Sequence, residues 1–345
     1  MNIIEQFINH PDMSLMEYEL LVEQAGNPEA VKRLQEEALR IRRQYYGDKV
    51  YIRGLIEFTN YCKNNCYYCG IRRDNKSLQR YRLTKEQIME CCQNGYDLGF
   101  RTFVFQGGED PWFTEDRMVS LVRSVHEAWP DCAITLSVGE LPKETYRALK
   151  KAGADRYLLR HETADKSHYE SLHPEGMSFS NRMQCLQNLR ALGYQVGAGF
   201  MVGSPGQNKF HLAKELYFLS HFKPDMVGIG PFIPHHKTRY KEEPAGAVSM
   251  TLFLLSVIRI LLPKVLLPAT TALGTIDPYG REKGLLAGAN VIMPNLSPEK
   301  YRKNYALYDN KICMGEEAAK CIRCLEKRVA SVGAQIVVDR GDVCK

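Results

Sequence analysis

Three cysteines, Cys62, Cys66 and Cys69, have the clearest potential for chemistry in this sequence. Their C-x3-C-x2-C spacing places three thiolates in one short loop. A structural zinc ion takes four closed ligands, and ferredoxin-type clusters use four thiolates. Three thiolates on a 4Fe-4S cluster leave one iron open to a further ligand, so the motif predicts a catalytic cluster. The alternative is three cysteines that pack in a core or bind zinc.

The cysteine loop follows the first of eight short apolar, β-branched segments, which we predict to be strands. Amphipathic segments between them predict helices, with Thr84 as an N-cap and Gly99, Gly153 and Gly193 at helix ends. The predicted strands are 50–58, 102–106, 133–137, 156–160, 195–201, 226–230, 266–270 and 290–293. This alternation indicates an α/β fold, a closed (βα)8 barrel of the TIM type, whose working residues lie at the carboxyl ends of the strands.

The rest of the chain divides around this barrel. Residues 1–49 are polar with helical periodicity, and we interpret them as an N-terminal helical extension. The barrel is assigned to residues 50–300. Residues 301–345 form a C-terminal segment that has no strand partner left and must pack against the barrel or over its mouth.

Composition narrows the class of protein. The formal net charge is +6, but Lys and Arg are interspersed with Asp and Glu, which is typical of a solvated surface and predicts no nucleic-acid partner. No run of 18 apolar residues predicts a membrane span, and the N-terminus does not resemble a signal peptide. We therefore expect a cytoplasmic protein whose 11 cysteines are thiols, which favours metal ligation over disulfides.

The cysteine motif after the first strand of a parallel barrel resembles the radical S-adenosylmethionine (SAM) superfamily. In that superfamily the open iron binds the amino and carboxylate groups of SAM, and the reduced cluster breaks the sulfonium C–S bond to give a 5′-deoxyadenosyl radical. The resemblance implies a 4Fe-4S cluster and SAM as cofactors and an external reductant as electron donor. It makes Cys62, Cys66 and Cys69 both the metal ligands and the catalytic residues.

Further segments agree with a SAM site. Glycines that end the second strand let the backbone approach a cofactor amino group closely. Segments 197–203 and 228–234 resemble the two walls beside the adenine in the superfamily. Taken alone, a Gly-Gly pair is also an ordinary turn, and a glycine-rich strand also a close-packed one. The predicted cofactor-binding residues are Gln106, Gly107, Gly108, Glu109, Glu162, Arg182, Met201 and Ile229.

Longer motifs, at 157–164, 268–275 and 290–295, resemble the radical SAM maturases of FeFe-hydrogenase. By that resemblance Glu162 hydrogen-bonds the ribose of SAM and Arg182 pairs with its carboxylate. The resemblance also implies a substrate wall suited to anions, with tyrosines that close over it. Without it, the arginines would be interpreted as salt-bridge partners and the tyrosines as packing residues. The predicted substrate-binding residues are Thr135, Arg156, Arg160, Thr270, Thr271, Tyr305 and Tyr308.

A second cysteine group, Cys313, Cys321 and Cys324, resembles an accessory cluster site that some of these maturases carry. Three thiolates at this spacing suit a second iron–sulfur cluster, and free thiols are the alternative. Cys91 and Cys92 lie in the middle of a predicted helix, so we expect them to pack in the core.

The resemblance implies an enzyme that cleaves SAM reductively during assembly of the H-cluster, the active site of FeFe-hydrogenase. Its substrate would be an Fe(II) complex carrying cysteine, CO and cyanide. Its partners would be a tyrosine-cleaving radical SAM maturase, which supplies the complex, and a GTPase scaffold maturase.

Three alternatives are open. A methylornithine synthase-like enzyme is the runner-up. Biotin synthase fits less well, because Phe105, Ala133 and Ala198 stand where that enzyme places cluster-binding cysteines. A non-catalytic iron–sulfur carrier or scaffold is the alternative of another class.

Overall fold

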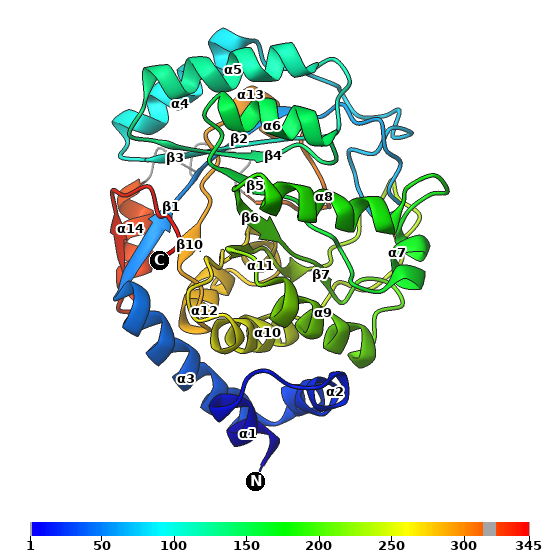
Figure 1. Ribbon diagram of the computed structural model, residues 1–345, viewed down its shortest axis with the longest axis vertical. Coiled ribbons are helices and arrows are strands. Elements are labelled where there is room, and N and C mark those ends of the chain that lie inside the picture. The colour runs from blue at the N-terminus through cyan, green and yellow to red at the C-terminus, as the bar shows by residue number, and fades with distance from the viewer. Residues whose placement is uncertain (1, 313–321, 345) are drawn as a thin grey trace.

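The computed structural model describes residues 2–312 and 322–344. Parallel strands surround a common interior and helices cover them from outside, as Figure 1 shows. Six strands form a parallel sheet in the order β2-β3-β4-β5-β6-β8. The strands are β1 (Lys49–Ile52), β2 (Gly54–Thr59), β3 (Thr102–Gly107), β4 (Ala133–Ser137), β5 (Arg156–Leu158), β6 (Gln195–Ala198), β7 (Met201–Val202), β8 (Met226–Val227), β9 (Gly230–Pro231), β10 (Val291–Ile292) and β11 (Gln335–Val337). The predicted α/β barrel is confirmed.

Isolated bridges close the barrel between its last and first strands. Met226 bridges to Leu266, Pro268 bridges to Val291, and β10 then pairs parallel with β1. The predicted strand 266–270 is therefore reduced to two bridges. Pro268 has no N–H to donate to a ladder, and Thr270 is already the N-cap of the next helix.

The helices follow the predicted pattern. Thr84 and Gln87 form a capping box at the start of α4, and Gly99, Gly153 and Gly193 have φ of 89°, 114° and 75° just after three helices. No helix in the described part of the chain is long and apolar enough to cross a bilayer. The helices are α1 (Ile3–Asn9), α2 (Leu15–Glu23), α3 (Pro28–Tyr46), α4 (Lys85–Asp97), α5 (Glu115–Ala128), α6 (Lys143–Lys151), α7 (Lys166–Leu172), α8 (Phe179–Ala191), α9 (Lys209–Phe222), α10 (Val248–Leu261), α11 (Thr271–Ile276), α12 (Gly280–Leu286), α13 (Glu299–Arg302) and α14 (Ile322–Ala330).

The two ends of the chain pack against the barrel in different ways. Helices α1, α2 and α3 precede β1 and share an apolar core with α9 and α10, below the barrel in Figure 1. The C-terminal segment does find a strand partner, contrary to our expectation, because β11 pairs parallel with β1. Beyond β11, the Arg340 carbonyl accepts hydrogen bonds from Thr102 and Arg156 near the start of their strands. The segment thus reaches the base of the barrel.

Candidate active site

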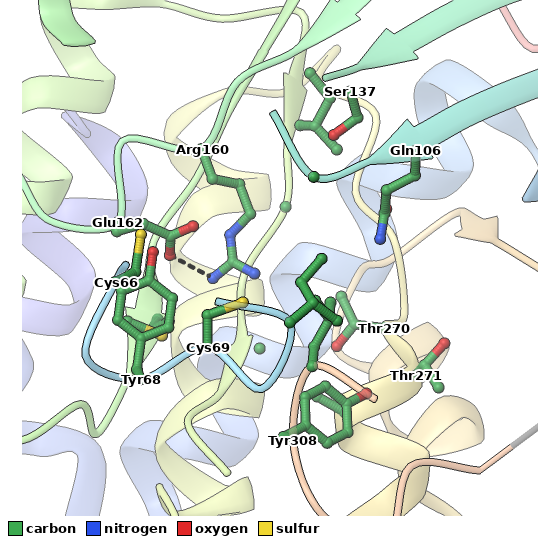
Figure 2. A pocket seen from close by; sticks show the side chains of 18 of the residues that line it. Cys66, Tyr68, Cys69, Gln106, Ser137, Arg160, Glu162, Thr270, Thr271 and Tyr308 are labelled. Atoms are coloured by element: carbon green, nitrogen blue, oxygen red, sulfur yellow. Dashed lines mark ion pairs between the residues drawn. The ribbon is translucent and has the colours of Figure 1, made fainter. Parts of the chain in front are cut away.

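A cavity of about 350 Å³ opens at the carboxyl ends of the strands. That volume suits a small-molecule ligand. Its wall combines the three-cysteine loop with the ends of β2, β3, β4, β5 and β9 and with residues 305–311. Figure 2 shows Cys66, Tyr68 and Cys69 on one side and Gln106, Thr270 and Thr271 on the other. The predicted site residues that line it are Cys62, Cys66, Cys69, Gln106, Gly107, Gly108, Glu109, Arg160, Glu162, Arg182, Met201, Thr270, Thr271, Tyr305 and Tyr308.

Backbone hydrogen bonds from three directions hold the cysteine loop. The Lys63 N–H donates to the Glu109 carbonyl at 2.8 Å, just beyond β3. The Tyr67 N–H donates to the carbonyl of Leu172, and the Gly70 N–H donates to the carbonyl of Leu307. The loop is therefore fixed by the barrel, by α7 and by the C-terminal segment.

The three sulfurs lie close enough to influence one another's ionisation. Burial raises the pKa of Cys69 to about 12, and the neighbouring Cys62 adds to that rise. Burial likewise raises the pKa of Cys66 well above its usual value, with further contributions from Cys69 and Cys62. Thiolates held together in a partly buried loop need a cation among them, and a metal cluster provides one.

Two observations test whether this cavity fits an iron–sulfur cluster with SAM. First, a side chain at Gly108 would collide with the Tyr61 carbonyl and with Cys62, so the backbone passes directly beside the cysteine loop. Second, buried polar atoms without a hydrogen-bond partner among the described residues include Arg160 Nε and Thr270 Oγ1. Such atoms are costly unless a ligand satisfies them. The donor set and these atoms fit a cluster and a polar cofactor.

Charged side chains alternate in sign beside the cysteine loop. Arg182 on α8 lies 2.6 Å from Glu140 and 4.0 Å from Glu109, and Lys63 pairs with Glu109 at 3.2 Å. Burial by itself lowers the pKa of Arg182, but Glu140 and Glu109 outweigh it and the net pKa is raised. Arg182 therefore stays charged where a carboxylate ligand would meet it.

Glu162 and Arg160 form an ion pair at the end of β5, drawn as a dashed line in Figure 2. Glu162 Oε2 lies 3.1 Å from Arg160 Nη2. Neither atom has the alignment of a hydrogen bond, so both keep hydrogen-bonding capacity toward the cavity.

The far side of the cavity carries hydroxyl and amide groups. Thr270 is the N-cap of α11 and Thr271 is its first residue, and both line the cavity together with Tyr308 (Figure 2). The Gln106 amide donates to the Tyr305 hydroxyl at 3.4 Å, and Tyr305 is buried. Residues from strand ends that are distant in sequence thus line the same cavity.

The structure places three predicted residues away from the cavity wall. Arg156 lies at the start of β5, where its guanidinium pairs with Asp342 at 2.6 Å, so it belongs to the base of the barrel. Thr135 is level with Arg156 in the β4–β5 ladder, below the wall. Ile229 packs in the apolar core, while Gly228 and Gly230 on either side of it line the cavity. Their roles in cofactor or substrate binding stay predictions.

Lining residues that the sequence analysis did not assign to the site include Glu57, Lys311 and Tyr68. The Glu57 side chain is fully buried and forms an ion pair with Lys311. Tyr68 lies inside the cysteine motif, and its hydroxyl is 3.3 Å from His173 Nε2. Glu57 is a carboxylate inside an otherwise apolar strand, which was a signal for a buried partner.

The second cysteine group is described only in part. Cys313 and Cys321 lie outside the described residues. Cys324 lies on the exposed part of α14. Cys91 and Cys92 lie on α4 and are buried in the core, as expected.

Comparisons with known proteins identify the class. The model of the radical SAM superfamily matches residues 56–218, which include the cysteine motif, β5 and Arg182. The chain is 49% identical over 314 residues to the [FeFe] hydrogenase maturase subunit HydE of Thermotoga maritima, covering 91% of this chain and 88% of that protein. It is 30% identical to the 3-methylornithine synthase of Methanosarcina acetivorans, covering 89% of this chain and 86% of the relative. The crystal structure of methylornithine synthase superposes with a TM-score of 0.85, at 29% identity and 97% coverage of both chains.

The chain therefore belongs to the radical SAM superfamily and, within it, to the family of the hydrogenase maturase HydE. It is a radical SAM enzyme, and that membership implies a 4Fe-4S cluster and SAM. The predicted enzyme class is confirmed.

Proposed function

We propose that this chain cleaves SAM reductively and acts in the assembly of the FeFe-hydrogenase active site. One observation carries the proposal: a single cavity joins the three cysteines to a separate polar wall that contains Arg160, Thr270 and Tyr308. Similarity over most of the chain to a hydrogenase maturase supports it.

The cofactor end of the cavity is assigned to the residues nearest the cysteine loop. Cys62, Cys66 and Cys69 would hold the cluster, with Gly108 beside them. Arg182 would pair with the SAM carboxylate and Glu162 would accept hydrogen bonds from its ribose, because their charges and free acceptor positions suit these groups. When bound, cluster and SAM supply a reductive cleavage of the sulfonium C–S bond that yields a 5′-deoxyadenosyl radical.

Further predicted cofactor-binding residues, at the ends of the strands, complete the cofactor end of the cavity. Gln106, Gly107, Glu109 and Met201 line the cavity between the loop and β7, so they can orient SAM and exclude water from it. Tyr68 adds a half-buried ring at the cysteine loop.

The substrate end is assigned to Arg160, Thr270, Thr271, Tyr305 and Tyr308. We add Lys311 to this set. Its ammonium donates to Glu57 and to the Tyr305 carbonyl, which leaves one of three N–H groups for a ligand. Cationic and hydroxyl donors suit an anionic or cyanide-bearing iron complex with a cysteine ligand.

The cellular context is proposed with the function. The enzyme would work in the cytoplasm with an external reductant, a tyrosine-cleaving maturase that supplies the iron complex, and a GTPase scaffold maturase that receives the product. With all three thiols reduced, Cys313, Cys321 and Cys324 would hold a second iron–sulfur cluster.

The test uses anaerobically reconstituted protein reduced with dithionite. Release of 5′-deoxyadenosine or an adenosylated product from SAM is expected, together with support of FeFe-hydrogenase activation when the two partner maturases are present. SAM turnover without activation would favour another substrate. No SAM turnover under any condition would favour a carrier or scaffold.

A second candidate is an amino-acid mutase like 3-methylornithine synthase, favoured by the 0.85 TM-score. It predicts that the reduced enzyme releases 3-methylornithine from a mixture of the common amino acids. Mass spectrometry of the products separates the two candidates.

A further inference from the structure

Glu162, the proposed ribose ligand, has an unusual backbone. Its φ is 66°, in the left-handed region that residues other than glycine rarely adopt. This conformation costs free energy, which the surrounding contacts must offset. Strained residues of this kind cluster at functional sites, so the contacts that impose the strain are of interest.

Neighbouring strand ends hold part of this turn. The Glu162 N–H donates to the Gly199 carbonyl at 3.0 Å, and the Met201 N–H donates to the Glu162 carbonyl at 3.4 Å. These bonds tie the end of β5 to the segment between β6 and β7.

A side chain from α9 holds the residues on both sides of Glu162. Glu215 Oε1 accepts a hydrogen bond from the Ala164 N–H at 2.6 Å, and Glu215 Oε2 lies 2.7 Å from His161 Nε2. The Gly199 N–H donates to His161 Nδ1 at 3.3 Å, so the imidazole proton belongs on Nε2 and is donated to Glu215. The side chains of His161 and Glu215 are both 0% exposed.

Burying the Glu215 carboxylate costs more free energy than a purely structural contact requires. A buried carboxylate is costly unless it is paired, and no lysine or arginine in the described part of the chain forms an ion pair with Glu215. The nearby Lys214 instead pairs with Asp165. Among the described residues, the donors to Glu215 are the two groups that flank Glu162.

We propose that Glu215 is a positioning residue that, through His161 and the Ala164 N–H, holds Glu162 in its strained conformation and aims its carboxylate into the cavity. The inference rests on the proposed role of Glu162 as the ribose ligand. It assigns cofactor affinity to a carboxylate on the outer helix layer that does not line the cavity itself.

The test compares the dissociation constant for SAM in reconstituted wild type, Glu215→Gln and Lys214→Met. A glutamine offers one acceptor and one donor where two donors point, and His161 cannot switch tautomer without losing its bond from Gly199. Lys214→Met is the matched control, because it breaks an ion pair on the same helix but leaves the Glu162 turn intact. S-methyl-L-methionine, a sulfonium without a ribose, is the second probe. Iron content and thermal midpoint are measured for each variant.

We expect Glu215→Gln to weaken SAM binding at least fivefold, with iron content and S-methyl-L-methionine affinity unchanged, while Lys214→Met keeps wild-type affinity for both. Glu215→Asp, whose carboxylate is too short to reach both donors, gives the same comparison if the glutamine variant does not fold. Unchanged SAM affinity, or equal loss for both probes, overturns the inference. A wild type that binds no SAM overturns the proposed function and the inference with it.

Discussion

The ammonium of Lys311 donates to the carboxylate of Glu57 inside the cavity, although 254 residues separate the two in sequence. Asn295 donates to the second oxygen of Glu57 at 2.9 Å, and Lys311 also donates to the Tyr305 carbonyl at 2.9 Å. The pair therefore ties the C-terminal segment to the first strand of the large sheet, at the mouth of the barrel.

Removing one member of this pair should cost stability. Lys311→Met leaves the fully buried Glu57 without its cation, and we expect a loss of about 3–5 kcal/mol in the free energy of unfolding. The double variant Glu57→Gln/Lys311→Met removes both charges and should recover most of that loss. Denaturant unfolding of the three proteins measures both effects. A single variant within about 1 kcal/mol of wild type would contradict a tight buried pair.

The cysteine loop and the core cysteines should respond differently to substitution. Cys62→Ala removes one of the three thiolates at the cavity, so it should abolish both cluster retention and 5′-deoxyadenosine release. Cys91→Ala changes a residue that packs in the core, and should keep both. Iron and sulfide analysis with chromatographic product assay checks this. Cys321→Ala, at the second cysteine group, should also leave SAM cleavage largely intact, and equal losses in Cys62→Ala and Cys321→Ala would argue against separate roles.

The two arginines of the β5 region should separate substrate capture from stability. Arg160→Ala removes a guanidinium from the cavity wall and should reduce substrate-dependent turnover about 10- to 100-fold, since a hydrogen bond to a charged group contributes about 1.5–3 kcal/mol. SAM affinity should change less than turnover. Arg156→Met, the matched variant at the base, should lower the thermal midpoint instead. The reverse pattern in steady-state kinetics and calorimetry would reassign the substrate wall.

The Asp342–Arg156 contact should make stability depend on acid pH. Burial by itself raises the pKa of Asp342, but the charge of Arg156 and hydrogen bonds from Gln195, Arg156 and Arg340 lower it to about 2. The folded-state pKa is thus below the unfolded value of about 3.9, so the contribution to stability is present above about pH 4 and is lost as pH falls toward 2. The stability difference between wild type and Asp342→Asn should shrink over that range. A difference that stayed constant with pH would exclude this linkage.

The sequence was sufficient for the barrel and for most of one face of the cavity. Apolar strands and helix caps are local signals, and the three-cysteine loop is a compact motif. Local sequence does not indicate whether a residue lies at the base or at the mouth of the barrel. Arg156 and Arg160 lie on one short stretch, yet Arg156 pairs with Asp342 at the base while Arg160 lines the cavity.

Long-range pairing accounts for the other differences. Nothing near Lys311 in sequence indicates Glu57, and nothing near β11 indicates its parallel neighbour β1. These contacts depend on where the C-terminal segment packs against the barrel. The pairing of Glu215 with His161 is of the same kind, since the two residues lie 54 positions apart and meet only where α9 packs against the barrel.

The distance along the chain between the cysteine loop and the Lys311 wall has a consequence for biosynthesis. During translation the sulfur ligands leave the ribosome long before the segment that covers them. A nascent chain that still lacks the segment with Lys311 would therefore leave the cysteine loop accessible to the donors of iron and sulfide. Lys311 can pair with Glu57 only near the end of synthesis. A chain that ended before Lys311 would carry the three cysteines but lack part of the cavity wall.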